Sequence, residues 1–315
     1  MKTTESIFDR YEEIKPRLPE FKFSQKDTLK PCWLNNLGDL DDQFDMFLFD
    51  AFGVLNVGET VIDGAPERIK YLQAKDKLVY ILTNAASYQK PALMRKFSKL
   101  GFNFGEKNIV SSREILIEHL NDQTKISRDD ISQWGVISTG GLEDLPRDLD
   151  YAIYNVGAQH ANTEFWQADA YIFLSTSQWT EADQLQFLTH LKKYPKPIFV
   201  GNPDVVAPRE TGITLEPGYF AHEIIDKTNC TVEFFGKPFG NAFSAAIKHA
   251  KNTKPDLSLP RCLMVGDTLH TDILGGAAAG MKTALITNYG TYAGQDISPY
   301  VIKSEILPNF ILPTI

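Results

Sequence analysis

The sequence has little cysteine, no long apolar run and no surplus of positive charge. Its three cysteines are Cys32, Cys230 and Cys262, and none lies in a C-x-x-C spacing, so we expect neither a thiolate zinc site nor a redox dithiol. No apolar run approaches the roughly 18 residues that a membrane span needs, and the N-terminal segment lacks the apolar core of a signal peptide. These absences predict a cytoplasmic protein with no membrane partner.

The charge balance argues against a nucleic-acid partner. The formal net charge is −8 at pH 7, whereas a nucleic-acid-binding surface neutralises many phosphates with Lys and Arg. We therefore expect no nucleic-acid partner, although a small local basic pocket is compatible with this total. The length of 315 residues predicts about two domains or one large one.

Beyond residue 40, short apolar runs alternate with helical patterns. Strands are expected at Phe44–Phe49, Leu78–Leu82, Ile198–Val200, Thr231–Phe235, Cys262–Val265 and Thr283–Thr287. Helices are expected at Ala65–Ala74, Gln89–Leu100, Glu181–Lys193, Tyr219–Thr228 and Ala242–Ala250. This alternation predicts an α/β fold with a mainly parallel sheet covered by helices. Residues 1–40 are polar and interrupted by prolines, which predicts an N-terminal helical extension lying on the core.

Polar residues end several of the predicted strands. Asp50 follows the first strand, and Thr83 with Asn84 follows the second. Lys237 follows the run EFF, and Asp267 with Asp272 follows the run LMV. Because ligands bind at the carboxyl ends of parallel strands, we expect these side chains to converge at one edge of the sheet.

This set of side chains has a chemical logic. A carboxylate such as Asp50 can attack phosphorus when the phosphoryl charge is neutralised. Neighbouring carboxylates repel each other unless a cation lies between them, and Mg²⁺ prefers such hard oxygen ligands. A lysine can neutralise phosphate oxygens. Each residue alone could equally be a helix cap or a solvated side chain, but the ordered set favours a phosphate site that contains Mg²⁺.

The order and spacing of these motifs resemble the haloacid dehalogenase superfamily, subclass IIA, over roughly residues 45–290. The matching motifs are DAFGVL at 50–55, GNPDVVAP at 201–208, GKP at 236–238 and VGDTLHTDILGGAAAG at 265–280. The resemblance implies a Rossmann-like three-layer α/β/α core formed by residues 41–111 and 205–315. It also implies an α/β cap domain inserted at residues 112–204.

The resemblance further implies a role for each matching position. Asp50 would be the nucleophile, Thr83 and Asn84 would bind the transferred group, and Lys237 would stabilise that group. Asn202, in the GNPD motif, would join the substrate-binding residues. Mg²⁺ would be held by Asp50, the backbone carbonyl of Phe52 and Asp267, with Asp272 supporting the site, through water.

Phe52 departs from the family pattern. Phosphatases of the family carry a second aspartate two positions after the nucleophile, which acts as general acid and then as general base, and phenylalanine cannot transfer a proton. An aromatic residue at this position is similar to the dehalogenases of the superfamily, which work without metal. The aspartates of the metal site and Lys237 nevertheless point to a phosphatase.

We therefore expect a Mg²⁺-dependent hydrolase that cleaves a small phosphorylated metabolite through an aspartyl-phosphate intermediate, slowly because of Phe52. Two alternatives stay open: a degenerate protein that binds a phosphorylated ligand without turnover, and dehalogenase-like chemistry without metal. Members of the family are often homodimers, which makes a homodimer one implied assembly. The sequence leaves the identity of the substrate open.

Overall fold

The computed structural model describes residues 3–21, 31–122, 131–154, 163–209 and 212–315. Its helices are α1 (Thr4–Ile14), α2 (Ala65–Ala74), α3 (Lys90–Lys99), α4 (Ser112–Asn121), α5 (Thr163–Trp166), α6 (Glu181–Lys193), α7 (Pro217–Lys227), α8 (Gly240–Thr253), α9 (Leu274–Ala278) and α10 (Ser298–Ser304). Among these residues, none of the helices combines the length and the apolar character required to cross a bilayer.

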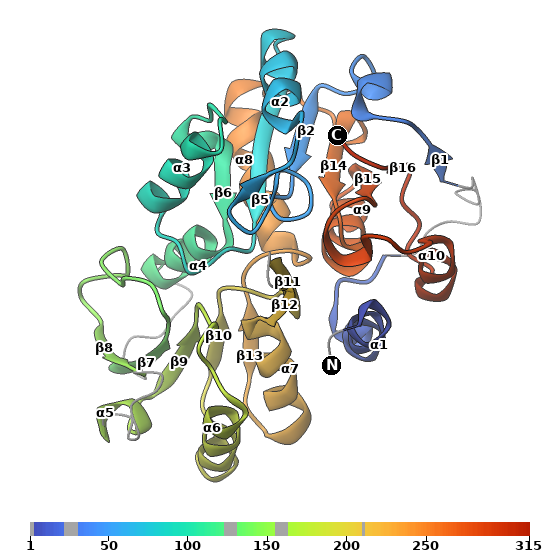
Figure 1. The fold of residues 1–315 in the computed structure, drawn as a ribbon. Helices are drawn as coiled ribbons and strands as arrows, with labels where there is room; N and C mark the ends of the chain where they lie inside the picture. The colour runs from blue at the N-terminus through green and yellow to red at the C-terminus, as the bar shows by residue number, and fades with distance from the viewer. Residues whose placement is uncertain (1–2, 22–30, 123–130, 155–162, 210–211) are drawn as a thin grey trace.

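The strands form two large parallel sheets and two short hairpins (Figure 1). The larger sheet has the order β1 (Cys32–Trp33), β16 (Phe310–Leu312), β15 (Lys282–Ile286), β14 (Cys262–Gly266), β2 (Met46–Phe49), β5 (Leu78–Thr83) and β6 (Ile109–Ser111). The second sheet has the order β13 (Val232–Phe234), β10 (Ile198–Val200), β9 (Ala170–Phe173), β7 (Gln133–Ile137) and β8 (Asp150–Ile153). The hairpins pair β3 (Asn56–Val57) with β4 (Thr60–Val61), and β11 (Val206–Arg209) with β12 (Gly212–Leu215).

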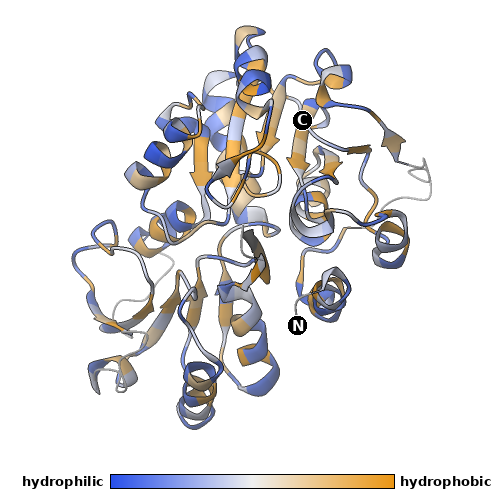
Figure 2. Cartoon of the chain, in the orientation of Figure 1, coloured by the Kyte–Doolittle hydropathy of each residue, from blue (hydrophilic) through white to orange (hydrophobic). Residues whose placement is uncertain are grey.

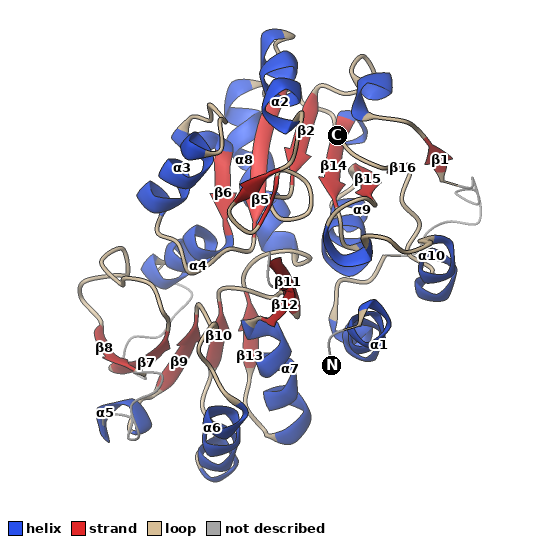
Figure 3. Ribbon diagram, in the orientation of Figure 1, coloured by secondary structure: helices blue, strands red, loops and turns tan. Residues whose placement is uncertain are grey.

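Strand β2 shows why the larger sheet is covered on both faces. All four of its residues are buried, and successive side chains of a strand point to opposite faces. Met46 and Leu48 pack in the cluster that contains α8, while Phe47 and Phe49 pack in the cluster that contains α2 and α3. Figure 2 shows the strands as strongly hydrophobic, and Figure 3 shows helices on both sides. The predicted α/β architecture with a three-layer core is confirmed.

The cap extends further along the chain than the sequence predicted. Strand β13 pairs in parallel with β10 of the second sheet, and α7 packs on that sheet through Phe220 and Ile224. The predicted return to the core at residue 205 is therefore wrong, because after the β11–β12 hairpin the chain adds α7 and β13 to the cap before it returns. The pattern of a strand, a helix and a strand is the same in both sheets, so it does not reveal which sheet a strand joins.

The first 40 residues are only partly the predicted helical extension. Helix α1 is present, but Cys32–Trp33 forms strand β1, which pairs in parallel with β16 at the edge of the larger sheet. A strand of two residues is too short to show a periodicity of its own. The purely helical description of this segment is therefore wrong.

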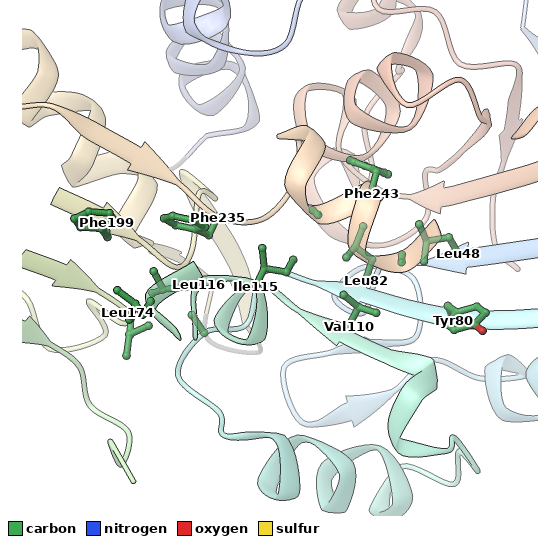
Figure 4. Close-up of a cluster of buried hydrophobic side chains, with 14 of the residues drawn as sticks. Leu48, Tyr80, Leu82, Val110, Ile115, Leu116, Leu174, Phe199, Phe235 and Phe243 are labelled. Carbon is green, nitrogen blue, oxygen red and sulfur yellow. The ribbon is translucent and has the colours of Figure 1, made fainter. Parts of the chain in front are cut away.

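One hydrophobic cluster, here called the seam cluster, continues from the larger sheet into the cap. Its members include Leu48, Leu82, Val110, Leu116, Leu174, Phe199, Phe235 and Phe243 (Figure 4). Leu116 of α4 is fully buried there, and Figure 4 places it with Leu174 of the cap on one side and Ile115 on the other. The two sheets are thus joined by packed apolar side chains as well as by the connecting chain.

Truncating Leu116 should weaken both domains together. We expect Leu116→Ala to lower the free energy of unfolding by about 2–5 kcal/mol, because it leaves a cavity in the seam cluster. The matched control is Leu185→Ala on α6, whose residue is 67% exposed and whose change should stay within about 0.5 kcal/mol. Urea unfolding followed by circular dichroism measures the free energy of unfolding of both variants. Equal losses of stability in Leu116→Ala and Leu185→Ala would contradict the role of the seam cluster.

His222 on α7 is an unusual member of the cap interior. It is 1% exposed, its ring stacks on Phe234 at 4.7 Å between centroids, and neither ring nitrogen has a hydrogen-bond partner among the described residues. Burial, together with the nearby cations Arg17 and Arg10, lowers its pKa to about 3. The folded protein therefore keeps this imidazole neutral, whereas the unfolded chain protonates it near pH 6.5.

The titration of His222 predicts a loss of stability in acid. Between pH 6.5 and 3 the unfolded chain binds more protons at this residue than the folded chain does, so the free energy of unfolding falls as the pH falls. From pH 7.5 to pH 5 the loss is about 2 kcal/mol. The variant His222→Phe keeps an aromatic ring that cannot titrate, so its stability should fall less over the same range. If the free energy of unfolding fell equally with pH in the wild type and in His222→Phe, this account would be refuted.

Candidate functional site

The predicted site residues do converge, at the point where the order of the larger sheet reverses. From β2 the sheet continues through β5 in one direction and through β14 in the other. Asp50 follows β2, Thr83 ends β5, and Asp267 follows β14. Lys237 arrives from a different direction than predicted, because it follows β13 of the cap sheet. Both domains therefore contribute to the site.

The Lys237 ammonium lies between two carboxylates at the base of the site. Its Nζ is 2.5 Å from Asp50 Oδ1 and 2.7 Å from Asp272 Oδ1, and the residue is 2% exposed. Burial alone would lower the pKa of Lys237, but Asp272 and Asp50 outweigh it and hold the pKa above its usual value. The lysine is thus a fixed positive charge beside the predicted nucleophile.

The carboxylates together carry more negative charge than Lys237 neutralises. Burial, together with the charges of Asp272 and Asp267, raises the pKa of Asp50 to about 8 against the opposing effect of Lys237. Burial and the charge of Asp272 raise the pKa of Asp267 to about 7. Oxygen atoms of Asp50, Asp267 and Asp272 all lie within 4.8 Å of one another. A divalent cation that prefers oxygen ligands fits this cluster, because it would relieve the repulsion.

Backbone groups fix the orientation of Asp267 and Asp272. Thr291 N–H donates to Asp267 Oδ2 at 2.7 Å, while the amides of Asp267 and Thr268 both donate to Asp272 Oδ2 at 3.1 Å. Since Asp272 Oδ1 accepts from Lys237, both oxygens of Asp272 already have protein donors. Asp272 therefore positions Lys237 and the Asp267 loop, and of these three aspartates only Asp50 and Asp267 line the adjacent cavity.

Two glycines make room for the Asp267 carboxylate. Gly53 has φ +79° and Gly290 has φ +75°, a region that L side chains avoid. A Cβ atom at Gly53 would lie 2.7 Å from Asp267 Cγ, and one at Gly290 would lie 1.9 Å from Asp267 Oδ2. The glycine of the DAFGVL motif is thus needed for close approach to the acid as well as for the turn.

A cavity of about 490 Å³ opens above these residues between the core and the cap. The predicted residues Asp50, Phe52, Thr83, Asn84, Asn202 and Asp267 all line it. The cap supplies hydroxyl groups, including Thr139, Ser175, Ser177 and Thr214. Among the described residues that line the cavity there is no Lys, Arg or His, and the acids Asp204 and Glu216 lie in its wall. The cavity wall is therefore polar and acidic, and Lys237, which does not line it, is connected to it through its ion pair with Asp50.

The two asparagines tie segments of the site together. Asn84 donates from Nδ2 to the Lys237 carbonyl at 2.9 Å and to Asp204 Oδ1 at 2.8 Å, and its Oδ1 accepts from Lys237 N–H at 2.8 Å. Asn202 accepts from Asp204 N–H and donates to Glu216 Oε2. Thr83 Oγ1 accepts from Ala85 N–H. The side-chain amides of Asn84 and Asn202 already bond to protein groups. Binding of substrate by these two residues stays a prediction.

The ring of Phe52 occupies the position that the sequence identified as unusual. It lines the cavity, and the ammonium of Lys96 lies 4.8 Å from its centroid. This environment stabilises an aromatic ring through a cation–π contact and supplies no proton donor at that position. Lys96 itself does not line the cavity, so this contact is a structural one.

Sequence reasoning missed several residues of the cavity, among them Asp204 and Tyr11. Asp204 belongs to the GNPD motif beside Asn202, and its position next to a predicted site residue was a usable signal. Burial, together with the charge of Asp50, raises the pKa of Asp204 to about 8 against the opposing effect of Lys237. Tyr11 comes from α1, more than thirty residues before Asp50, and nothing in its local sequence separates it from the other buried residues of that helix.

Comparison with known proteins agrees with this geometry. Residues 47–152 match the haloacid dehalogenase-like hydrolase family, and residues 234–314 match a related family of haloacid dehalogenase-like hydrolases. Human glycerol-3-phosphate phosphatase is 26% identical over 292 residues, which cover 86% of this chain and 88% of that protein.

Solved structures share the fold. A possible sugar phosphatase of the haloacid dehalogenase superfamily from Cytophaga hutchinsonii superimposes with a TM-score of 0.74 at 25% identity, covering 90% of this chain and 98% of that chain. Glycerol phosphate phosphatase from Mycobacterium tuberculosis in complex with magnesium superimposes with a TM-score of 0.61 at 19% identity, covering 86% and 75%. With the motifs, the double-sheet topology and the acidic site all in agreement, this chain belongs to the haloacid dehalogenase-like hydrolases.

Proposed function

We propose that the protein is a Mg²⁺-dependent phosphatase that hydrolyses a small phosphate ester. The observation that carries this proposal is the buried Lys237 ammonium, 2.5 Å from Asp50 and 2.7 Å from Asp272, at the base of a cavity with the size of a small-ligand site. A relative that is a glycerol-3-phosphate phosphatase supports the same reaction class.

Asp50 is the nucleophile in this proposal. One of its carboxylate oxygens forms a bond to phosphorus while the bond from phosphorus to the ester oxygen breaks, and the ester oxygen leaves on the opposite side as an alkoxide, which takes a proton from water. Lys237 holds positive charge beside the attacking carboxylate, where it offsets the repulsion between that carboxylate and the phosphoryl oxygens. The Thr83 Oγ1 accepts from Ala85 N–H. Among the hydrogen bonds of the described residues this hydroxyl does not donate, so its proton can bond a phosphoryl oxygen. Water then hydrolyses the aspartyl phosphate.

The metal would be held by Asp50, Asp267 and the backbone carbonyl of Phe52. When bound, Mg²⁺ supplies charge neutralisation for the phosphoryl group. Asp272 keeps Lys237 and the Asp267 loop in place. The hydroxyl-rich wall favours a substrate whose organic part is neutral and hydroxylated, because none of the described residues that line the cavity is a Lys, Arg or His that could pair with a second anionic group.

Phe52 controls which esters react well. No proton donor lies at this position, so an alkoxide leaving group has to depart without one. Esters whose leaving oxygen is stable as an anion should suffer least. This same residue is the observation that favours the second candidate, a protein that binds a phosphorylated ligand without turnover. Assay of nitrophenyl phosphate with Mg²⁺ and with a chelator tests both candidates. Turnover that requires Mg²⁺ supports the phosphatase, and no turnover under either condition supports the ligand-binding protein. Turnover that does not need the metal supports dehalogenase-like chemistry.

Replacing Asp267 by Asn should weaken Mg²⁺ binding by about tenfold or more, because one anionic ligand is lost. Isothermal calorimetry measures the affinity. The matched control is Asp256→Asn, which removes the same charge from an exposed residue ahead of β14, at the other end of that strand. Asp267→Asn should fold, since it also removes repulsion from Asp272. Unchanged affinity in Asp267→Asn would remove this residue from the metal site.

Replacing Phe52 by Asp should raise kcat/KM for an alkyl phosphate such as glycerol 3-phosphate. General acid catalysis typically contributes about 10²–10⁴-fold, and the substitution restores a carboxyl group at the position where family phosphatases carry one. The gain should be smaller for nitrophenyl phosphate, because nitrophenolate leaves without a proton.

The assay for Phe52→Asp uses saturating Mg²⁺, and a melting curve verifies that the variant is folded. The matched control is Phe52→Asn, which has the same size and polarity but cannot donate a carboxyl proton. A folded, metal-loaded Phe52→Asp variant with no gain on either ester would show that the missing proton donor does not limit the rate. The ligand-binding candidate would then be favoured.

A further inference from the structure

Helix α1 lies outside the matched family segments, which begin at residue 47, yet it reaches the cavity. We propose that α1 is part of the active site and that Tyr11 is a substrate-binding residue, whose hydroxyl donates to an oxygen of the organic part of the substrate. This inference rests on the proposed phosphatase function and adds a residue to it.

The sequence of α1 builds a helix with one buried face. Thr3 and Ser6 form a capping box that satisfies the first turn. Ile7, Phe8, Tyr11 and Ile14 follow at helical spacing, and all four are buried. They belong to a cluster that also contains Leu269, Tyr292 and Val205. Tyr11 is thus held by packing on a regular element, which restricts the position of its hydroxyl group.

The core side of α1 contacts the two loops that carry the metal-site residues. Glu12 Oε1 lies 2.6 Å from Nε2 of His270, three residues after Asp267, and the Tyr11 ring stacks on His270 at 5.0 Å. The Thr4 hydroxyl donates to the carbonyl of Thr291 at 3.3 Å, and the amide of Thr291 donates to Asp267. Displacement of α1 would therefore disturb both loops.

The other side of α1 contacts the cap. Arg10 Nη2 lies 3.1 Å from Asp226 Oδ2 on α7, and Arg17 pairs with the same carboxylate. Arg17 also donates to the His222 carbonyl at 3.3 Å. Figure 1 shows α1 next to the cap on one side and the C-terminal part of the core on the other. Tyr11 is consequently placed where the two domains meet.

The Tyr11 hydroxyl itself is positioned to donate. Tyr11 is 3% exposed and lines the cavity together with Asp50 and Asp267. Its oxygen accepts from the backbone N–H of Val205 at 3.2 Å, which orients the group. Among the hydrogen bonds of the described residues the Tyr11 hydroxyl only accepts, so its proton is available to a ligand. Phosphate is expected at Lys237 and Thr83, which leaves the organic part of the ester for Tyr11.

The test compares Tyr11→Phe with Tyr292→Phe. Both residues are buried in the same cluster, but Tyr292 does not line the cavity, so Tyr292→Phe reports on packing alone. For glycerol 3-phosphate we expect Tyr11→Phe to raise KM about five- to tenfold, the effect of one lost hydrogen bond, with kcat within about twofold. For nitrophenyl phosphate KM should stay unchanged, and Tyr292→Phe should leave both KM values unchanged. Melting curves verify folding.

Binding measurements keep this proposal separate from the phosphatase function. In the presence of Mg²⁺, calorimetry should show that Tyr11→Phe loses affinity for glycerol 3-phosphate but keeps its affinity for inorganic phosphate. If the wild type binds these ligands but turns over neither ester, the proposed catalysis fails while Tyr11 is still tested. Equal losses in Tyr11→Phe and Tyr292→Phe, equal losses for both ligands, or no loss at all would each overturn the assignment of Tyr11.

Discussion

The site depends on one buried ammonium group held between two buried carboxylates. Removing the charges of Lys237, Asp50 and Asp272 from water is costly, and the cost is offset only where geometry and further hydrogen bonds are good. The chain supplies these bonds from several elements: two backbone amides on Asp272, the Asn84 amide on the Lys237 loop, and glycines that allow close approach to Asp267. The strands β2, β5, β14 and β13 bring these groups together, because each group ends or follows one of them.

Lys237 also explains why the cap cannot be regarded as a separate lid. The residue follows a cap strand but pairs with carboxylates of the core. The seam cluster places Leu174 and Phe199 of the cap sheet in one hydrophobic core with Leu48 and Leu82. A large swing of the cap would therefore expose apolar surface and separate charges at once. Substrate access through changes in side chains or loops costs less than a motion of the whole cap.

Local sequence patterns were sufficient to predict most helices and strands and most of the site residues. They were insufficient to predict which distant elements pack or pair with one another. Buried strands such as Met46–Phe49 and Ile198–Val200 are short apolar runs with polar ends, so their positions and the polar residues after them could be predicted. Whether β13 joins the cap or the core depends on pairing with β10, which no local pattern specifies. Tyr11 reaches the cavity only because α1 packs across His270 and Val205. Partners of this kind are set by tertiary structure and not by spacing along the chain.

The pairing of the chain's two ends has a consequence for its synthesis. Among the described strands, β1 pairs with β16 alone, and α1 contacts Asp226, His270 and Lys303. A ribosome makes the N-terminal segment first, but the residues that contact α1 and the strand that pairs with β1 emerge much later. Until then the apolar face of α1 has no native surface to cover, and chaperones recognise such exposed faces. Contacts that span nearly the whole sequence also carry a large entropic cost of loop closure. Completion of the C-terminal strand is therefore the step that allows both the sheet edge and the Tyr11 side of the cavity to form.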